Sequence, residues 1–93
     1  MNFRNSNQTP ATIVDVREPY EFQMEHVEGA INIPVGSVIS RIEEFRKMPK
    51  PIALYCQSGN RSGMAVSLLY AYGIEAYNAG SLEEAQSLMA QAS

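Results

Sequence analysis

The segment Ile52-Ala53-Leu54-Tyr55 limits the possible folds of this chain more than any other stretch. Its residues are apolar without alternation, and a polar segment follows them directly. An apolar run of this length predicts a strand that is buried on both faces. Such strands are typical of parallel sheets that are covered by helices on both sides. We therefore expect a mainly parallel sheet, covered by helices, with this segment in its interior.

The rest of the chain alternates between strand-like and helix-like segments. Apolar and β-branched runs predict further strands at 11–16, 30–33 and 74–78. Proline positions and apolar periodicity predict a short helix from Pro19 and longer helices at 37–47, 62–72 and 82–92. This strict alternation predicts an α/β domain.

Several residues mark the boundaries of these elements. Gly73 follows helix 62–72 at the position where a left-handed residue commonly ends a helix. The pair Ala79-Gly80 predicts a turn, and Ser81 with Glu84 matches the Ser-x-x-Glu capping box of a following helix. For helix 37–47 the spacing predicts one buried apolar face, made of Val38, Ile39, Ile42 and Phe45.

The size and charge of the chain exclude several classes of protein. Its 93 residues suit one compact domain, which we place at 11–93 after a flexible polar lead-in at 1–10. The net charge is −3 and the seven basic residues are scattered, so no nucleic-acid partner is expected. No stretch approaches the ~20 apolar residues of a membrane span. With no apolar leader at 1–8, we expect a cytoplasmic protein, and a processed exported form stays open.

The chain has a single cysteine and a single histidine. One cysteine excludes an internal disulfide, redox chemistry by a cysteine pair, and a zinc site with several cysteines. No metal site is therefore expected. Whatever chemistry Cys56 performs, it performs without a second thiol in its own chain.

The polar segment Cys56-Gln57-Ser58-Gly59-Asn60-Arg61-Ser62 lies between the buried strand and the next helix. Ligands bind beyond the carboxyl ends of parallel strands, and the amides of such a loop can converge on an anion. We expect these amides to lower the pKa of Cys56 and to keep its sulfur ionised and reachable from solvent. A lone cysteine after a buried strand is more commonly a core residue, but the polar neighbours favour the loop.

This segment resembles the Cys-x-x-Gly-x-Arg-Ser active-site loop of single-domain rhodaneses, the thiosulfate sulfurtransferases. Two upstream segments are also similar to signatures of that family. They are Asp15-Val16-Arg17-Glu18-Pro19-Tyr20-Glu21-Phe22 and His26-Val27-Glu28-Gly29-Ala30-Ile31-Asn32-Ile33-Pro34. The resemblance runs from about Thr12 to Gly80. It implies a rhodanese-like α/β fold with a central, mainly parallel sheet of four or five strands and helices on both faces.

The resemblance also implies a mechanism. The thiolate of Cys56 would attack the outer sulfur of thiosulfate, and the resulting persulfide would pass sulfur to cyanide or a thiol. No cofactor is implied. The implied partners are these small molecules, with a sulfur-relay protein as a further candidate and no membrane. The residues implied to bind substrate or persulfide are those of the loop: Gln57, Ser58, Gly59, Asn60, Arg61 and Ser62.

Other polar residues have both a functional and a structural interpretation. Asp15 and Arg17 could support the loop, with Arg17 meeting anions, although a structural ion pair or helix cap is the stronger expectation. Arg61 could neutralise incoming charge or brace the loop. For His26 we expect a structural, hydrogen-bonded role. The chain also departs from the family pattern at Glu25, where glycine is usual, and at Ala79-Gly80-Ser81-Leu82.

Two other functions compete with sulfur transfer. Protein tyrosine phosphatases use a related Cys-x5-Arg loop, but here only four residues separate Cys56 from Arg61, and this tighter ring suits a sulfur atom and crowds a tetrahedral phosphate. A sulfur-relay module with little activity on free thiosulfate is the other alternative. The amino-acid composition does not distinguish the phosphatase or the relay module from a rhodanese.

Overall fold

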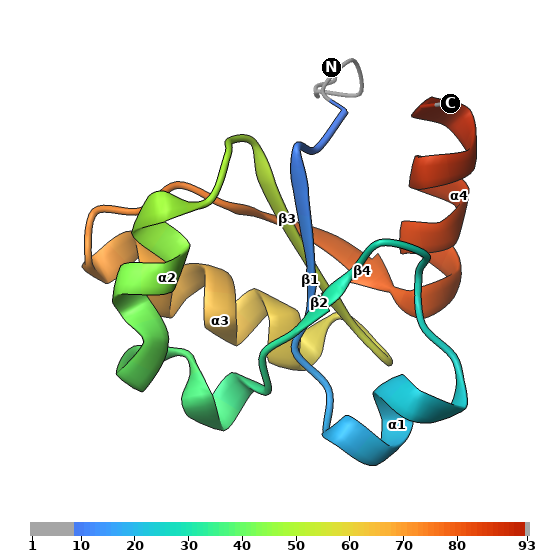
Figure 1. Ribbon diagram of the computed structural model, residues 1–93, viewed down its shortest axis with the longest axis horizontal. Helices are drawn as coiled ribbons and strands as arrows, with labels where there is room; N and C mark the ends of the chain where they lie inside the picture. The colour runs from blue at the N-terminus through green and yellow to red at the C-terminus, as the bar shows by residue number, and fades with distance from the viewer. Residues whose placement is uncertain (1–8, 93) are drawn as a thin grey trace.

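The sheet has four parallel strands among residues 9–92, the part of the chain that the computed structural model describes. The strands are β1 (Thr12–Asp15), β2 (Ile31–Asn32), β3 (Ile52–Cys56) and β4 (Tyr77–Ser81). Their order across the sheet is β2-β1-β3-β4 (Figure 1). The predicted α/β class and the parallel sheet are confirmed. The buried apolar run forms β3, with neighbours on both sides.

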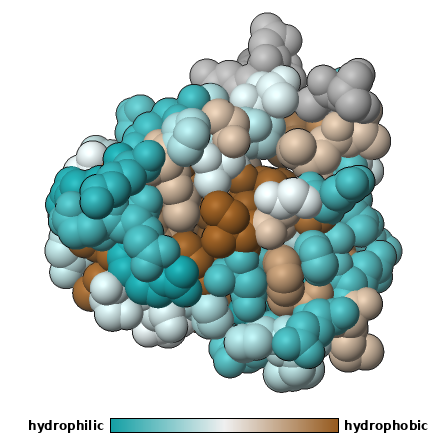
Figure 2. All heavy atoms as spheres, in the orientation of Figure 1, coloured by the Kyte–Doolittle hydropathy of each residue, from teal (hydrophilic) through white to brown (hydrophobic). Residues whose placement is uncertain are grey.

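Helices cover both faces of this sheet. Side chains that alternate along β1 and β3 enter two separate apolar clusters. Val14 and Leu54 pack with α2 (Ile42–Lys47) and α3 (Asn60–Ala71) on one face, where Phe45 and Leu69 are fully buried. On the other face, Ile13 and Tyr55 pack with α4 (Leu82–Ala92). In the space-filling view, an apolar area near the centre of the face is surrounded by hydrophilic groups (Figure 2).

The carboxyl ends of β1 and β3 lie side by side. The register pairs Val14 with Leu54 and Asp15 with Tyr55, and the amide of Val16 continues the ladder to the carbonyl of Tyr55. The residues that follow these strands therefore meet at one edge of the sheet. Helix α1 (Pro19–Met24) begins at this edge after β1, with Pro19 in its first position as predicted.

The predicted helix 37–47 is helical in a different way from the one expected. Only α2 (Ile42–Lys47) is an α-helix, and two 3-10 turns, Val35–Ser37 and Ile39–Arg41, precede it. The hydroxyl of Ser40 donates to the carbonyl of Ser37, which competes with the helical ladder. Ile39 is exposed, against expectation, and Ile42 is half-buried, while Val38 and Phe45 are buried as predicted.

The fourth strand is also displaced from its predicted position. It was expected at 74–78 with a turn at Ala79-Gly80, but β4 runs from Tyr77 to Ser81. The register jumps from Leu54↔Asn78 to Tyr55↔Gly80, so Ala79 is an extra residue, as in a β-bulge. Gly80 has a φ of 91°, a conformation that glycine adopts without strain.

The predicted helix ends of the second half are confirmed. The amides of Gly73 and Ile74 donate to the carbonyls of Tyr70 and Leu69, which is the Schellman arrangement. At the start of α4, Ser81 and Glu84 form the reciprocal capping box. Most of the predicted lead-in, residues 1–8, lies outside the described residues, and Pro10 is buried.

Candidate active site

Cys56 is the last residue of β3, and the loop after it leads directly into α3. Gly59 adopts a left-handed φ of 94° at the N-terminal cap of α3, which turns the chain back over the cysteine. A Cβ atom at Gly59 would stand 3.5 Å from the Cα of Gly80, so the loop also packs closely on β4. The predicted position of the loop, at the carboxyl edge of a parallel sheet, is confirmed.

Three hydrogen-bond donors converge on the sulfur of Cys56. The amide of Gly59 lies 3.0 Å from Sγ, and the amide and hydroxyl of Ser62 each lie 3.4 Å away. Both amides belong to the cap and first turn of α3, where N–H groups have no partner inside the helix. The loop therefore surrounds the sulfur with positive ends of dipoles.

These donors outweigh the effect of burial on the thiol. Burial alone would raise the pKa of Cys56, because it penalises the thiolate. The hydroxyl and amide of Ser62 and the amides of Ser58 and Gly59 act in the opposite direction. The net result is a pKa below the ordinary value of a cysteine, as the sequence predicted.

The expectation that the sulfur is reachable from solvent is wrong for this conformation of the loop. Cys56 has an exposed fraction of 0%, whereas Gln57, Ser58 and Asn60 are exposed. The same amides that favour the thiolate hold the loop closed around Sγ. A reagent can reach the sulfur only when this short, exposed loop shifts.

Arg61 braces the loop from outside. Its guanidinium donates to both carboxylate oxygens of Glu21 on α1, at 2.8 and 3.1 Å. Mainly through the hydrogen bond with Arg61, the pKa of Glu21 falls to about 2. Of the two roles predicted for Arg61, the structure has the bracing one. The sequence analysis named Glu21 only as part of a family signature and missed this contact across 40 positions.

Asp15 and Arg17 form the structural ion pair that the sequence favoured. The carboxylate of Asp15 accepts from the backbone and the guanidinium of Arg17, with a shortest distance of 2.7 Å, and both residues are buried. Arg17 also donates to the carbonyl of Glu25, and its guanidinium lies 5.7 Å from the ring centre of Tyr55. The pair fixes the turn between β1 and α1, and Arg17 is not free to meet an anion.

His26 is likewise structural, as predicted. Its ring stacks on Phe22 with a centroid distance of 3.8 Å. Its Nδ1 lies 2.7 Å from the carbonyl of Phe22, which fixes the proton on that nitrogen. The ring therefore helps to hold the chain after α1 and is not placed against the sulfur.

Asn78 is a further residue at the site, and the sequence analysis did not single it out. It was expected at the end of a strand, and instead lies inside β4, beside the cysteine loop. Its amide group contacts Gly59, Ser62 and Gly80. No sequence pattern signals this, because the contacts depend on the bulge that sets the register of β4.

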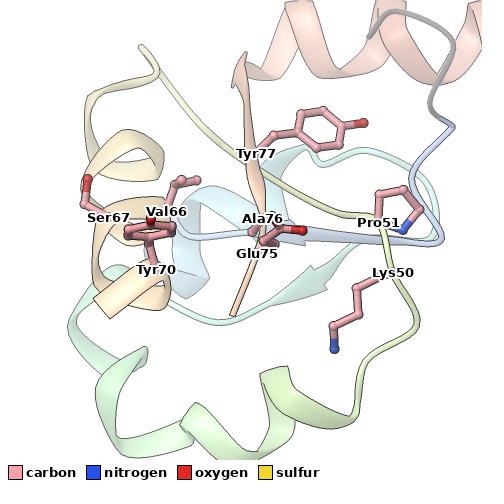
Figure 3. Close-up of a pocket in the computed structure, with 8 residues that line it drawn as sticks. All are labelled: Lys50, Pro51, Val66, Ser67, Tyr70, Glu75, Ala76 and Tyr77. Atoms are coloured by element: carbon pink, nitrogen blue, oxygen red, sulfur yellow. The ribbon is translucent and has the colours of Figure 1, made fainter. Parts of the chain in front are cut away.

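A cavity of about 430 Å³ opens beside the loop, and Gln57 is the loop residue that lines it. Arg17, Glu21 and Ser81 also line this cavity. A cavity of about 670 Å³ lies elsewhere, between the start of β3, α3 and the approach to β4, where Lys50, Tyr70 and Tyr77 line it (Figure 3). Size does not identify the functional site here, because neither Cys56 nor any residue of its loop lines the larger cavity.

Residues 9–92 show neither a cluster of metal-binding side chains nor a membrane-spanning helix. No group of three or more His, Cys, Asp or Glu side chains is arranged to hold a metal ion in this part of the chain. Within the same residues, no helix has the length and apolar character needed to cross a membrane.

Two bacterial proteins illustrate what this sequence is similar to. The chain is 46% identical over 69 residues to the uncharacterised protein YqhL of Bacillus subtilis (strain 168), which covers 73% of this chain and 54% of YqhL. It is 40% identical over 73 residues to the thiosulfate sulfurtransferase PspE of Escherichia coli (strain K12), which covers 76% of this chain and 70% of PspE. The chain thus spans only about half the length of YqhL.

The fold and the family model agree with these relatives. A solved structure described as a rhodanese with anions from E. coli superposes with a TM-score of 0.71 at 39% identity, and covers 78% of this chain and 88% of that one. The family model for the rhodanese-like domain matches residues 3–89. With the family model, the fold and a curated sulfurtransferase relative in agreement, this chain belongs to the rhodanese-like domain family.

Proposed function

We propose that this protein is a thiosulfate sulfurtransferase that carries sulfane sulfur as a persulfide on Cys56. The thiolate of Cys56 attacks the outer sulfur of thiosulfate. A new S–S bond forms, and the bond to the sulfonate sulfur breaks, so that sulfite leaves with the bonding electron pair. Cyanide or a thiolate then attacks the outer sulfur of the persulfide and regenerates the thiolate of Cys56.

The observation that carries this proposal is the convergence of Gly59 and Ser62 on the sulfur. A thiolate is both the required nucleophile and the leaving group of the second half-reaction, and the same donors stabilise it in both roles. The persulfide is also an anion, so a loop of amides suits it without any change of charge at the site.

Access to the sulfur is part of the proposal. The cavity beside Gln57 gives a small donor a place next to the loop. From there, a shift of the exposed residues Gln57 and Ser58 uncovers Sγ. Residues 57–62 then act as the loop that binds substrate and persulfide. The pair of Asp15 and Arg17 supports this loop from the end of β1.

Mass spectrometry after incubation with thiosulfate tests the proposal directly. We expect a gain of one sulfur atom on the intact protein, removed again by cyanide with formation of thiocyanate. Cys56→Ala and Cys56→Ser are the matched variants, and neither should gain mass. A wild-type protein that keeps its original mass at saturating thiosulfate, while iodoacetamide still alkylates Cys56, would contradict thiosulfate as the donor.

Phosphatase activity is not supported by the site. A phosphatase loop of the Cys-x5-Arg type has five residues between its cysteine and arginine, whereas here four residues separate Cys56 from Arg61. The guanidinium of Arg61 is also held by both carboxylate oxygens of Glu21. We expect no turnover of an aryl phosphate under conditions where sulfur uptake is complete. A linear release of phosphate that depends on Cys56 would reverse this assignment.

A sulfur relay between proteins is the second candidate, and one observation favours it. Both arginines near the loop are neutralised, Arg17 by Asp15 and Arg61 by Glu21. A free dianion such as thiosulfate thus finds little uncompensated positive charge there. If only a persulfidated protein loads Cys56, and thiosulfate does not, the relay is the better description.

Since both the thiosulfate reaction and the relay need a reduced thiol, we propose that the protein works in the cytoplasm.

A further inference from the structure

Asn78 joins the middle of the cysteine loop, at Gly59, to its end, at Ser62, through one side chain. Its Nδ2 donates to the carbonyl of Gly59 at 3.0 Å, and its Oδ1 accepts the hydroxyl of Ser62 at 2.7 Å. The amide of Gly80 donates to the same oxygen at 2.9 Å. Two donors meet Oδ1 and a carbonyl meets Nδ2, so the orientation of this amide group is fixed by its partners.

Asn78 therefore contacts both residues whose amides reach the sulfur of Cys56. Gly59 and Ser62 supply the donors at 3.0 and 3.4 Å from Sγ, and each has its second polar group bound to Asn78. The side chain of Asn78 also packs closely against α3. A Cβ atom at Gly63 would stand 3.3 Å from Nδ2 of Asn78, which is a tight contact, so a side chain there would push on this amide group.

The hydroxyl of Ser62 has only one proton to donate. It lies 2.7 Å from Oδ1 of Asn78 and 3.4 Å from Sγ of Cys56, so the shorter bond to Asn78 holds the proton while the sulfur is protonated. When the thiolate forms, the hydroxyl can turn toward it, and Oδ1 keeps the amide of Gly80 as a donor. In that state the bond from Ser62 to Oδ1 is given up, and the bond from Nδ2 of Asn78 to the carbonyl of Gly59 is the one that still holds the loop.

We propose that Asn78 is a positioning residue, which keeps Gly59 and Ser62 directed at the sulfur of Cys56 and so sets how readily the thiolate forms. This inference rests on the proposed function only where it concerns turnover. Its first consequence, a change in thiolate formation, needs no sulfur donor at all. Arg61 is a charged residue that interacts electrostatically with Cys56, and its guanidinium is paired with Glu21.

The experiment measures the rate of alkylation of Cys56 by iodoacetamide against pH, for the wild type, Asn78→Ala and Asn78→Asp. We expect the apparent thiol pKa to rise by about one unit in Asn78→Ala, because a charge-assisted hydrogen bond contributes on that scale. In Asn78→Asp the rise should be larger, because an oxygen replaces the donor to Gly59 and adds negative charge near the sulfur. Turnover should fall about tenfold in kcat with little change in KM.

Met48→Ala is the control for a general loss of stability. Met48 lies at the C-terminal cap of α2 and packs against the core, so its variant should lower Tm without moving the thiol pKa. Ser62→Ala combined with Asn78→Ala tests the route of the effect. The two pKa shifts should not add, since part of the influence of Asn78 passes through Ser62.

The outcomes separate this inference from the proposed function. If the wild type takes up sulfur from thiosulfate and Asn78→Ala keeps both the wild-type thiol pKa and kcat, the positioning role is wrong. If the thiol pKa rises in Asn78→Ala while the wild type takes up no sulfur, the positioning role holds and thiosulfate is excluded as the donor. A shift of equal size in Met48→Ala would also overturn the inference, because loss of stability would then explain it.

Discussion

Two arginine–carboxylate pairs flank the cysteine loop, and they differ in both burial and span. Asp15 and Arg17 are two residues apart, and their side chains are 0% and 4% exposed. Glu21 and Arg61 are 40 residues apart, and their side chains are 18% and 33% exposed. The first pair closes a turn within one segment, while the second joins helix α1 to the loop that surrounds the sulfur.

This difference separates stability from function at one site. If a buried pair loses one partner, the other charge is left unpaired in the core. The pair of Asp15 and Arg17 therefore contributes to the stability of the fold. A half-exposed pair adds little to stability, because water screens it, yet it can fix the position of a loop. We therefore expect substitutions in the two pairs to affect different properties. Disrupting the pair of Asp15 and Arg17 should lower stability, and removing Arg61 should lower activity.

The largest effect is expected for Asp15→Ala. It leaves the buried guanidinium of Arg17 without its carboxylate, and should lower the free energy of unfolding by about 3–5 kcal/mol. Urea denaturation of the purified protein measures this loss. The double variant Asp15→Leu/Arg17→Met removes both charges and should recover much of it. A loss below about 1 kcal/mol in the single variant would mean that the pair is not structural.

Arg61→Ala should instead reduce activity while the fold is retained. Loss of the brace lets the loop move, and a displacement of about 1 Å at a reacting group can reduce turnover about 100-fold. The free energy of unfolding should change by less than about 1 kcal/mol. Sulfur transfer from thiosulfate to cyanide and urea denaturation, measured on the same sample, give both values.

Glu21→Gln shows which role of Arg61 matters. If Arg61 acts as a brace, this variant should lose activity almost as Arg61→Ala does, because the same contact is broken. If Arg61 acted by binding the dianion, its release from Glu21 would lower the KM for thiosulfate. A lower KM in Glu21→Gln would therefore refute the brace.

A smaller effect is expected in the dependence of stability on pH. The pKa of Glu21 is lowered to about 2 from an ordinary value of 4.5, so the folded state favours its carboxylate. Its contribution is therefore complete above pH 4.5 and is lost as the pH falls toward about 2. The difference in unfolding free energy between wild type and Glu21→Gln should narrow over that interval. A difference that stays constant there would show that the pair does not form in solution.

The smallest effect is expected at the surface pair of Arg41 and Glu44. It has the same short distance, 2.8 Å, as the pair of Arg61 and Glu21, but it is more exposed and lies within the turn that begins α2. Arg41→Ala should leave both Tm and sulfur transfer at the wild-type level. A clear loss of activity in this variant would show that the assay responds to charge removal anywhere on the surface.

The sequence was sufficient for the parts of the molecule that depend on local patterns. The buried run at 52–55, the polar loop after it and the capping box at Ser81 each have a local signal, and each lies where it was expected. The position of Cys56 at the carboxyl edge of the sheet follows from these elements and the topology.

The parts that sequence reasoning missed depend on contacts between distant segments. Asn78 and Glu21 meet the loop only because β4 and α1 are placed beside it, and no local pattern records that placement. The shift of β4 depends on a bulge at Ala79, where Gly80 was expected to turn the chain. The burial of Cys56 itself was also missed, because a list of polar neighbours does not reveal that their amides close over the sulfur.

The closed loop has a consequence for the chemical lifetime of the protein. A thiolate is the form of cysteine that peroxides attack, and oxidation beyond sulfenic acid is in general irreversible. Since the chain holds one cysteine, a sulfenic acid at position 56 has no neighbouring thiol in its own chain to rescue it as a disulfide. Because Cys56 is fully buried under its loop, the structure keeps the sulfur out of contact with such oxidants.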